Sequence, residues 1–253
     1  MKGNTDMSTE SGTRVAIVTG GSRGIGRAVV RRLAEQGYAI VVGYAGNVAE
    51  AEAAVDEATS AGAKAVAFRA DVADEAAVAA MFDQAEAQFG GVDVVFNSAG
   101  RMALAPIADL DLDELDSLYR TNVRGAFAVA KQAARRVRAG GAIMLVSTSV
   151  VGAYFPSFGA YAAGKGAVES MTRILARELR GRDVTVNAVS PGPVATELLL
   201  SGASEEQLAQ MAADNPLGRL GEPSDIADVA AFLASAEGHW VNGQVLKANG
   251  GMV

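Results

Sequence analysis

The chain has 253 residues, 50% of them hydrophobic, which is enough for one large α/β domain. Its formal net charge of -7 gives no general attraction to nucleic acids or anionic membranes, so neither is expected as a partner. The chain has no cysteine, and His239 is its single histidine, which excludes disulfides, a thiolate nucleophile and a His- or Cys-rich metal site. We therefore expect no bound metal.

The first thirteen residues are polar and lack the apolar core of a signal peptide. No later run approaches the roughly 18 consecutive apolar residues of a membrane-spanning helix. We therefore predict a flexible tail over residues 1–13 and a cytoplasmic protein whose single domain covers residues 14–253.

Short runs rich in Val, Ile and Ala then alternate with longer segments of helical period. This pattern is typical of buried parallel strands joined by crossover helices. The runs predict strands over residues 15–19, 39–44, 65–69, 92–97, 142–148, 185–189 and 244–247. Together they predict a single-domain, doubly wound (Rossmann) parallel sheet of seven strands with helices on both faces.

Helices are predicted in the gaps, over residues 25–36, 48–61, 75–89, 112–138, 159–180 and 224–234. Gly37, Gly62 and Gly90 follow the first three helices and are suitable C-terminal stops. Residues 191–216 break the rhythm with a Pro-Gly-Pro start, three consecutive leucines and a short helical run over 205–212. We predict that this segment is a flap over a functional site.

A glycine-rich loop, Thr-Gly-Gly-Ser-Arg-Gly-Ile-Gly, occupies residues 19–26 between the first strand and the first helix. Glycines permit a tight turn and close approach to a pyrophosphate, and the helix N-terminus attracts its charge. Such a loop alone can be an ordinary strand-to-helix turn, but its position in this alternating chain favours a dinucleotide. The expected cofactor-binding residues in the loop are Gly20, Ser22, Arg23, Gly24, Ile25 and Gly26.

The turn after the second strand, residues 42–47, has no carboxylate to bind the adenosine ribose of NAD. Arg23 supplies a positive charge instead, which suits the 2′-phosphate of NADP. We therefore expect NADP(H) as the cofactor, with Tyr44 and Asn47 contributing from the turn. The alternative is that Tyr44 stacks on adenine and Arg23 points to solvent, which would leave the two cofactors almost equal.

Tyr161 and Lys165 are four residues apart at the start of a predicted helix, so they share one face. A cation one turn away stabilises a phenolate, and we expect it to bring the pKa of Tyr161 down toward the neutral range. Such a pair alone is usually just part of a helix surface, so the rest of the chain must decide.

With these motifs in view, the chain from about Arg14 to its C-terminus resembles the short-chain dehydrogenase/reductase family. Two positions depart from the family's usual pattern: Ser98, where a second Asn is common, and Gly164, where Ser or Ala is common. The matching positions are Gly20, Gly24, Gly26, Asp71, Val72, Asn97, Ala99, Gly100, Asn122, Ser149, Tyr161, Lys165, Pro191 and Gly192.

The resemblance implies four catalytic residues. Tyr161 would protonate the carbonyl oxygen and Ser149 would hydrogen-bond to it, while Lys165 would hold the ribose and Asn122 would support a water relay. Ser149 is preferred to Ser147 because Val-Val-Gly follows it. The resemblance also implies further cofactor contacts at Asp71, Val72, Asn97, Ala99, Gly100, Tyr161, Lys165, Pro191, Gly192, Val194 and Thr196. The expected substrate pocket comprises Met102, Val151, Phe155, Phe158, Leu198 and Leu199.

We therefore expect an NADP(H)-dependent oxidoreductase that interconverts a carbonyl and an alcohol on a small or medium, mainly apolar substrate. One alternative is a 3-oxoacyl thioester reductase that acts on acyl-carrier protein or CoA substrates. Another is a non-catalytic NADP(H)-binding sensor. We also expect a homotetramer, or at least a homodimer, formed through the alanine-rich helices over residues 112–138 and 159–180.

Overall fold

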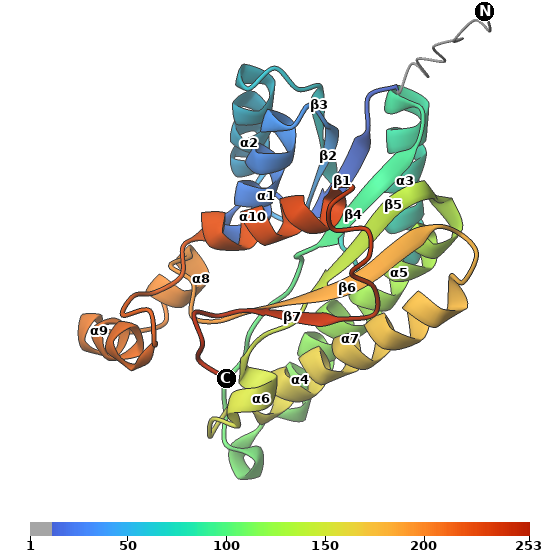
Figure 1. The fold of residues 1–253 in the computed structure, drawn as a ribbon. Helices are drawn as coiled ribbons and strands as arrows, with labels where there is room; N and C mark the ends of the chain where they lie inside the picture. Colours follow the sequence, from blue (N-terminus) through green and yellow to red (C-terminus); the bar gives the residue numbers. More distant parts are fainter. Residues whose placement is uncertain (1–11) are drawn as a thin grey trace, which may run out of the picture.

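The computed structural model describes residues 12–253 and has seven parallel strands in the order β3-β2-β1-β4-β5-β6-β7 (Figure 1). The predicted tail lies outside the described residues, apart from residues 12 and 13. Within the described part of the chain, no helix combines the length and apolar character needed to cross a membrane. The strands are β1 (Val15–Thr19), β2 (Ala39–Tyr44), β3 (Ala65–Arg69), β4 (Val92–Asn97), β5 (Val137–Val146), β6 (Val184–Pro191) and β7 (Val245–Ala248).

The central strands β1 and β4 are buried along their whole length and mainly apolar, because helices cover both faces of the sheet. Helices α3, α5 and α7 pack on one face, and α1, α2 and α10 pack on the other (Figure 1). This arrangement confirms the predicted doubly wound fold. The bounds of these helices are α1 (Gly24–Glu35), α2 (Val48–Ser60), α3 (Glu75–Phe89), α5 (Gly125–Arg136), α7 (Gly159–Glu178) and α10 (Pro223–Ala234).

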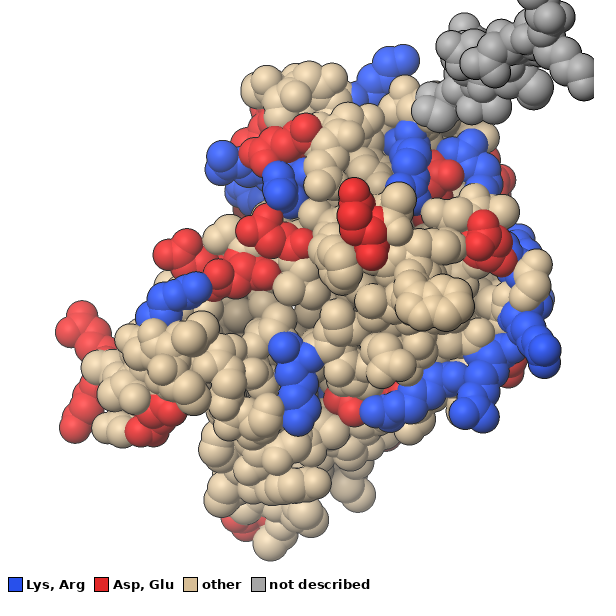
Figure 2. Space-filling view, in the orientation of Figure 1, with Lys and Arg blue, Asp and Glu red and all other residues tan. Residues whose placement is uncertain are grey.

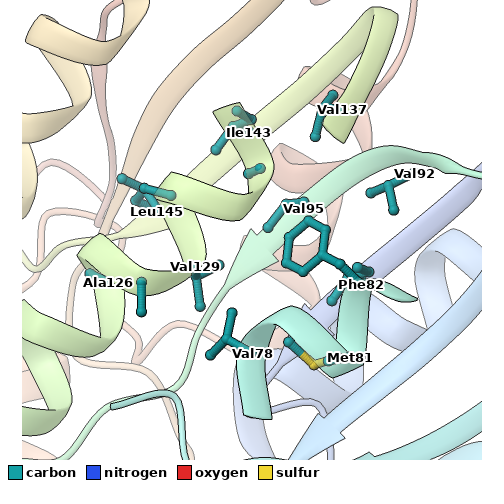
Figure 3. Close-up of a cluster of buried hydrophobic side chains, with 14 of the residues drawn as sticks. Val78, Met81, Phe82, Val92, Val95, Ala126, Val129, Val137, Ile143 and Leu145 are labelled. Atoms are coloured by element: carbon teal, nitrogen blue, oxygen red, sulfur yellow. The ribbon is translucent and has the colours of Figure 1, made fainter. Parts of the chain in front are cut away.

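The core beneath α3 and α5 illustrates how the sheet is held. Phe82 of α3 is fully buried and lies near Val92 and Val95 of β4, while Val129 of α5 belongs to the same cluster as Ile143 and Leu145 of β5 (Figure 3). Burying a side chain of this size stabilises the fold by roughly 1.5–3 kcal/mol. The rigid sheet that results fixes the strand ends from which the site is built.

The predicted continuous helix over residues 112–138 is wrong. It consists of α4 (Leu112–Tyr119), a π-helical turn η2 (Arg120–Arg124) and α5, and β5 begins at Val137. Hydrophobic periodicity cannot reveal a single wide turn, which changes the direction of side chains without interrupting the helix. β5 also ends at Val146, so Ser147 and Thr148 lie beyond the strand in which they were predicted.

Residues 192–216, which we call the flap segment, carry two helices, α8 (Glu197–Leu200) and α9 (Glu205–Asp214). They project beside the carboxyl edge of the sheet (Figure 1). The C-terminus returns to the same edge near α6 (Val150–Ala153) (Figure 1). A 3-10 turn, η1 (Ile107–Asp109), follows the loop after β4.

Candidate active site

A cleft of about 1100 Å³ runs along the carboxyl edge of the sheet. The sheet order reverses between β1 and β4, so the loops that follow these two strands diverge and leave a crevice there. Open α/β sheets bind ligands at such a point. The cleft continues past the ends of β5 and β6 to the flap segment.

The glycine-rich loop forms one end of the cleft. Gly20 has a φ of 64°, and a Cβ there would lie 2.9 Å from the Ala99 backbone nitrogen. The α1 N-terminus follows with no side-chain cap and no acid in its first turn, so its N–H groups favour an anion. Ser22, Arg23, Gly24 and Ile25 line the cleft. Gly26 does not line the cleft but allows close packing, since a Cβ there would lie 2.1 Å from the Gly20 carbonyl oxygen.

The turn after β2 lines the cleft through Tyr44 and Asn47, two of the residues expected to contact the cofactor. The Asn47 side chain also caps α2, accepting from the Glu50 N–H at 3.3 Å. Arg23 is exposed, and its Nη1 lies 3.5 Å from a carboxylate oxygen of Glu197 in the flap segment. Glu50 and Glu197 both line the cleft, so carboxylates flank the position predicted for the 2′-phosphate.

The loops after β3 and β4 form the floor. Asp71, Val72, Ala99 and Gly100 line the cleft. Asn97 lies behind it and accepts a hydrogen bond from the Thr19 hydroxyl at 2.6 Å, which ties the ends of β1 and β4. The backbone N–H of Ala73 and the nearby Arg120 hold the pKa of Asp71 below its ordinary value.

Asn122 is buried in the π-helical turn η2. Its side-chain oxygen accepts from the Arg101 N–H at 2.9 Å, and its amide donates to the Arg101 carbonyl oxygen at 2.8 Å. Asn122 therefore fixes the loop after β4 beside Gly100. Asn122 does not line the cleft; Thr121 does.

Tyr161 and Lys165 share one face of α7 at the centre of the cleft. Lys165 is buried, its ammonium donates to the Val146 carbonyl oxygen at 2.7 Å, and its Nζ lies 5.9 Å from the centroid of the Tyr161 ring. Burial lowers the pKa of Lys165 to about 8. Burial also raises the pKa of Tyr161 to about 12, whereas the sequence predicted a lowered value. The phenol therefore keeps its proton at neutral pH.

Three consecutive hydroxyls follow β5, and they have different partners. Ser147 donates to Glu169 at 2.8 Å. The Thr148 hydroxyl lies beside the Tyr161 phenol and lowers its pKa, against the effect of burial. Ser149 donates to the Ser190 carbonyl oxygen at 3.3 Å and accepts from the Asn249 amide at 2.9 Å. Thr148 is thus the hydroxyl that faces the tyrosine.

The wide end of the cleft is mainly apolar. Phe155 and Phe158 lie with their ring centroids 6.0 Å apart, across from the leucines of α8. Val151 does not line the cleft, because the short helix α6 presents its neighbour Val150 instead. Five of the residues expected in the substrate pocket line the cleft: Met102, Phe155, Phe158, Leu198 and Leu199. Leu104, Met211 and Met252 line it as well.

The remaining expected cofactor contacts, Pro191, Gly192, Val194 and Thr196, all line the cleft where β6 leads into the flap segment. Among the described residues, no three His, Asp or Glu side chains come together in a way that would hold a metal ion. Sequence reasoning did not find Thr148, Glu50, Glu197 or Asn249. No spacing rule separates Thr148 from its two serine neighbours, and the carboxylate of Glu197 comes from a distant part of the chain.

Residues 20–253 match the model of a protein family described as Enoyl-(Acyl carrier protein) reductase. A Picea abies relative named short-chain type dehydrogenase/reductase is 44% identical over 252 residues, which cover 96% of this chain and 93% of the relative. The chain belongs to the short-chain dehydrogenase/reductase family.

A second relative, from Arabidopsis thaliana, is named NADPH-dependent aldehyde reductase-like protein, chloroplastic. It is 43% identical over 254 residues, which cover 95% of this chain and 94% of the relative. A solved structure of a blue fluorescent protein from a metagenomic library, in complex with NADPH, is 38% identical and has a TM-score of 0.90. The match covers 96% of this chain and 98% of that chain.

Proposed function

We propose that this protein is an NADP(H)-dependent oxidoreductase that interconverts a carbonyl and an alcohol. The observation that carries the proposal is the Tyr161 phenol, which is protonated at neutral pH and lies beside the Thr148 hydroxyl in a cleft that begins at the glycine-rich loop. The NADPH-dependent aldehyde reductase name of the Arabidopsis relative and the NADPH complex of the solved structure support the same reaction class.

The residues present fit the cofactor. Gly20 leaves a cradle that a Cβ would fill, and the uncapped N-terminus of α1 suits the pyrophosphate. The turn after β2 and Arg23 would hold the adenosine end, and Lys165 would hold the nicotinamide ribose. When bound, the nicotinamide supplies or accepts the hydride.

Side chains of the protein transfer the proton and stabilise the charges that form. In the reductive direction the Tyr161 hydroxyl donates its proton to the carbonyl oxygen, and the Thr148 hydroxyl stabilises the charge that develops on that oxygen. The Lys165 ammonium stabilises the phenolate left behind. Asn122 positions the loop after β4, and the Ser149 hydroxyl is held by Ser190 and Asn249.

The wall of phenylalanine, leucine and methionine side chains favours a small or medium, mainly apolar substrate over a polyol. The runner-up, a 3-oxoacyl thioester reductase that docks an acidic acyl-carrier protein, would use a basic patch near the mouth of the cleft. Arg136 and Arg138 instead lie where β5 begins, at the opposite edge of the sheet, and pair with Asp83, Glu86 and Asp93. This placement favours a free carbonyl substrate.

The function is tested with a panel of ketones, aldehydes, sugars and 3-oxoacyl thioesters, followed by NADPH absorbance. Turnover of apolar ketones or aldehydes is expected, with sugars poor. A best rate with a thioester would select the runner-up. NADPH binding without any turnover would select the sensor, which has no need for a proton-donating tyrosine.

For assembly, we propose the homotetramer, or at least a homodimer, that the sequence predicted. Four alanines of α5, Ala126, Ala128, Ala130 and Ala133, pack instead in the chain's own core. Exposed apolar side chains on the same two helices, Phe127 of α5 and Ile174 of α7, are the better candidates. The cytoplasmic location stays a prediction, since the Arabidopsis relative is named as chloroplastic.

A second apolar area lies near β7. Trp240, in the loop before β7, is 99% exposed. Figure 2 shows that the middle of the face over β7 has few charged side chains, which gather around its rim. An apolar centre with a polar rim is the usual composition of a subunit interface.

A further inference from the structure

Asn249, the first residue after β7, is buried beside the turn that follows β5 and carries Ser149. Its side-chain amide donates to the Ser149 hydroxyl oxygen at 2.9 Å, and its side-chain oxygen accepts from the Gly251 N–H at 3.0 Å. Both ends of the side chain are therefore satisfied, as a buried amide requires. One partner, Ser149, stands next to the Thr148 hydroxyl that contacts Tyr161.

The two ends of the flap segment bind the backbone of two consecutive residues, Ala248 and Asn249. At its start, the Gly192 N–H donates to the Ala248 carbonyl oxygen at 3.1 Å, and a Cβ on Gly192 would lie 2.9 Å from the Asn249 Cβ. At its end, the Asn215 side-chain amide donates to the Asn249 carbonyl oxygen at 2.8 Å. Asn215 is itself buried, and its side-chain oxygen accepts from the Leu217 N–H.

We propose that Asn249 is a positioning residue that fixes both ends of the flap segment against the Ser149 turn. The carbonyl oxygens of Ala248 and Asn249 hold the two ends of the flap segment, and the Asn249 side chain fixes this stretch of backbone to the Ser149 turn. The distance between the apolar wall of α8 and the Tyr161 hydroxyl then depends on Asn249. The inference rests on the proposed function for its kinetic consequence, but the geometry exists without it.

Chemistry explains why an amide suits this position. The Ser149 proton is directed to the Ser190 carbonyl oxygen, so the serine oxygen needs a donor on its other side. The Asn249 amide is that donor. An aspartate would keep the bond from the Gly251 N–H and lose the bond to Ser149, which makes Asn249→Asp an informative second variant.

Asn187 of β6 provides a matched control. It is a buried asparagine whose amide donates to the Val241 carbonyl oxygen at 2.7 Å and whose oxygen accepts from the Gln244 N–H at 3.0 Å. Asn187 therefore joins β6 to the chain just before β7, whereas Asn249 joins the chain just after β7 to Ser149. Asn187 does not line the cleft. Asn187→Ala should lower the unfolding temperature without affecting the flap segment.

The experiment compares wild type, Asn249→Ala, Asn249→Asp and Asn187→Ala in the full chain with saturating NADPH. A Glu-specific protease reports on the flap segment through cleavage after Glu197, Glu205 or Glu206, and carbonyl kinetics give KM and kcat separately. Both Asn249 variants should be cleaved there roughly tenfold faster and raise the carbonyl KM roughly tenfold, with kcat changed much less. Asn187→Ala should change neither the cleavage rate nor the carbonyl KM, although it should lower the unfolding temperature by about as much as the Asn249 variants do.

Wild-type cleavage rates in both Asn249 variants would overturn the proposal. Equal effects of Asn187→Ala on cleavage and KM would also overturn the proposal, because they would show that Asn249 acts only through the overall stability of the protein. If no carbonyl is turned over by any form, the proposed function fails, while the protease comparison still decides the role of Asn249.

Discussion

Tyr161 illustrates how burial prepares a single residue for proton donation. A phenol whose pKa is near 12 stays protonated across the neutral range, as reduction requires. Tyr161→Phe removes only the oxygen that carries this proton. Carbonyl reduction should fall by roughly 100-fold or more, with NADPH affinity nearly unchanged. Steady-state rates and an NADPH fluorescence titration would check this, and near wild-type turnover would contradict the assignment.

The Ser-Thr-Ser sequence after β5 leads to a second prediction. Thr148→Ala removes the hydroxyl that contacts Tyr161 and should lower reductive kcat/KM by about 10- to 100-fold, with Thr148→Ser restoring most of the rate. Ser149→Ala should cost less, because its proton is already directed to the Ser190 carbonyl oxygen. Kinetics of the three variants decide, and a larger loss in Ser149→Ala than in Thr148→Ala would return the catalytic role to Ser149.

Lys165 determines the pH dependence. Its pKa of about 8 means that it loses its charge as pH rises through that value, while Tyr161 remains protonated until much higher pH. The phenolate formed in reduction then lacks its cationic partner. Reductive kcat/KM should therefore be constant below pH 8 and fall above it, and Lys165→Met should lack this inflection. A wild-type profile that stays flat to pH 10 would show that the ammonium is not required.

Between elements, the contact of Arg23 with Glu197 joins the cofactor loop to α8. Arg23→Ala should lower kcat/KM with NADPH by roughly 10- to 150-fold and leave NADH little changed, because only NADPH carries the 2′-phosphate. Tyr44→Asp should repel that phosphate and favour NADH. Glu197→Gln, which frees Arg23, should preserve NADPH use. A wild-type preference for NADH, or no loss in Arg23→Ala, would refute this role of the arginine.

The sequence predicted elements well where a repeated pattern exists. The bounds of β1 to β4 and of α3 agree with the structure because continuous apolar runs, helical period and glycine stops all point to the same ends. The π-helical turn η2 and the early start of β5 carry no such pattern. Asn122 was found by motif, but its bonds to the Arg101 backbone come from the three-dimensional turn.

The same limit applies within the site. The glycine positions and the Tyr161–Lys165 spacing depend on residues that are close together along the chain, so they can be recognised in the sequence. The pKa of Tyr161, the choice of Thr148 and the role of Asn249 depend on burial and on partners far along the chain. Local patterns therefore predicted which residues gather at the cleft better than how each is held.

For the whole molecule, exposed apolar side chains on α5 and α7 predict self-association. Phe127 and Ile174 are 55% and 57% exposed, and burying them between subunits would remove apolar surface from water. Light scattering at micromolar concentration should give the mass of a dimer or tetramer, and Phe127→Glu with Ile174→Glu should lower it. Lys131→Glu, on an exposed position of α5, is the charge control. A monomeric wild-type mass would contradict the prediction.

Trp240 is the chain's single tryptophan and stands almost fully in water on the face over β7. The wavelength of its fluorescence emission therefore reports on the solvent exposure of that one surface, with no contribution from any other indole. Fluorescence emission at long wavelength at every protein concentration would mean that the Trp240 ring stays exposed to solvent in the assembly. A shift to shorter wavelength on concentration would mean that a neighbouring subunit covers it, so a cuvette measurement can tell which face the subunits share.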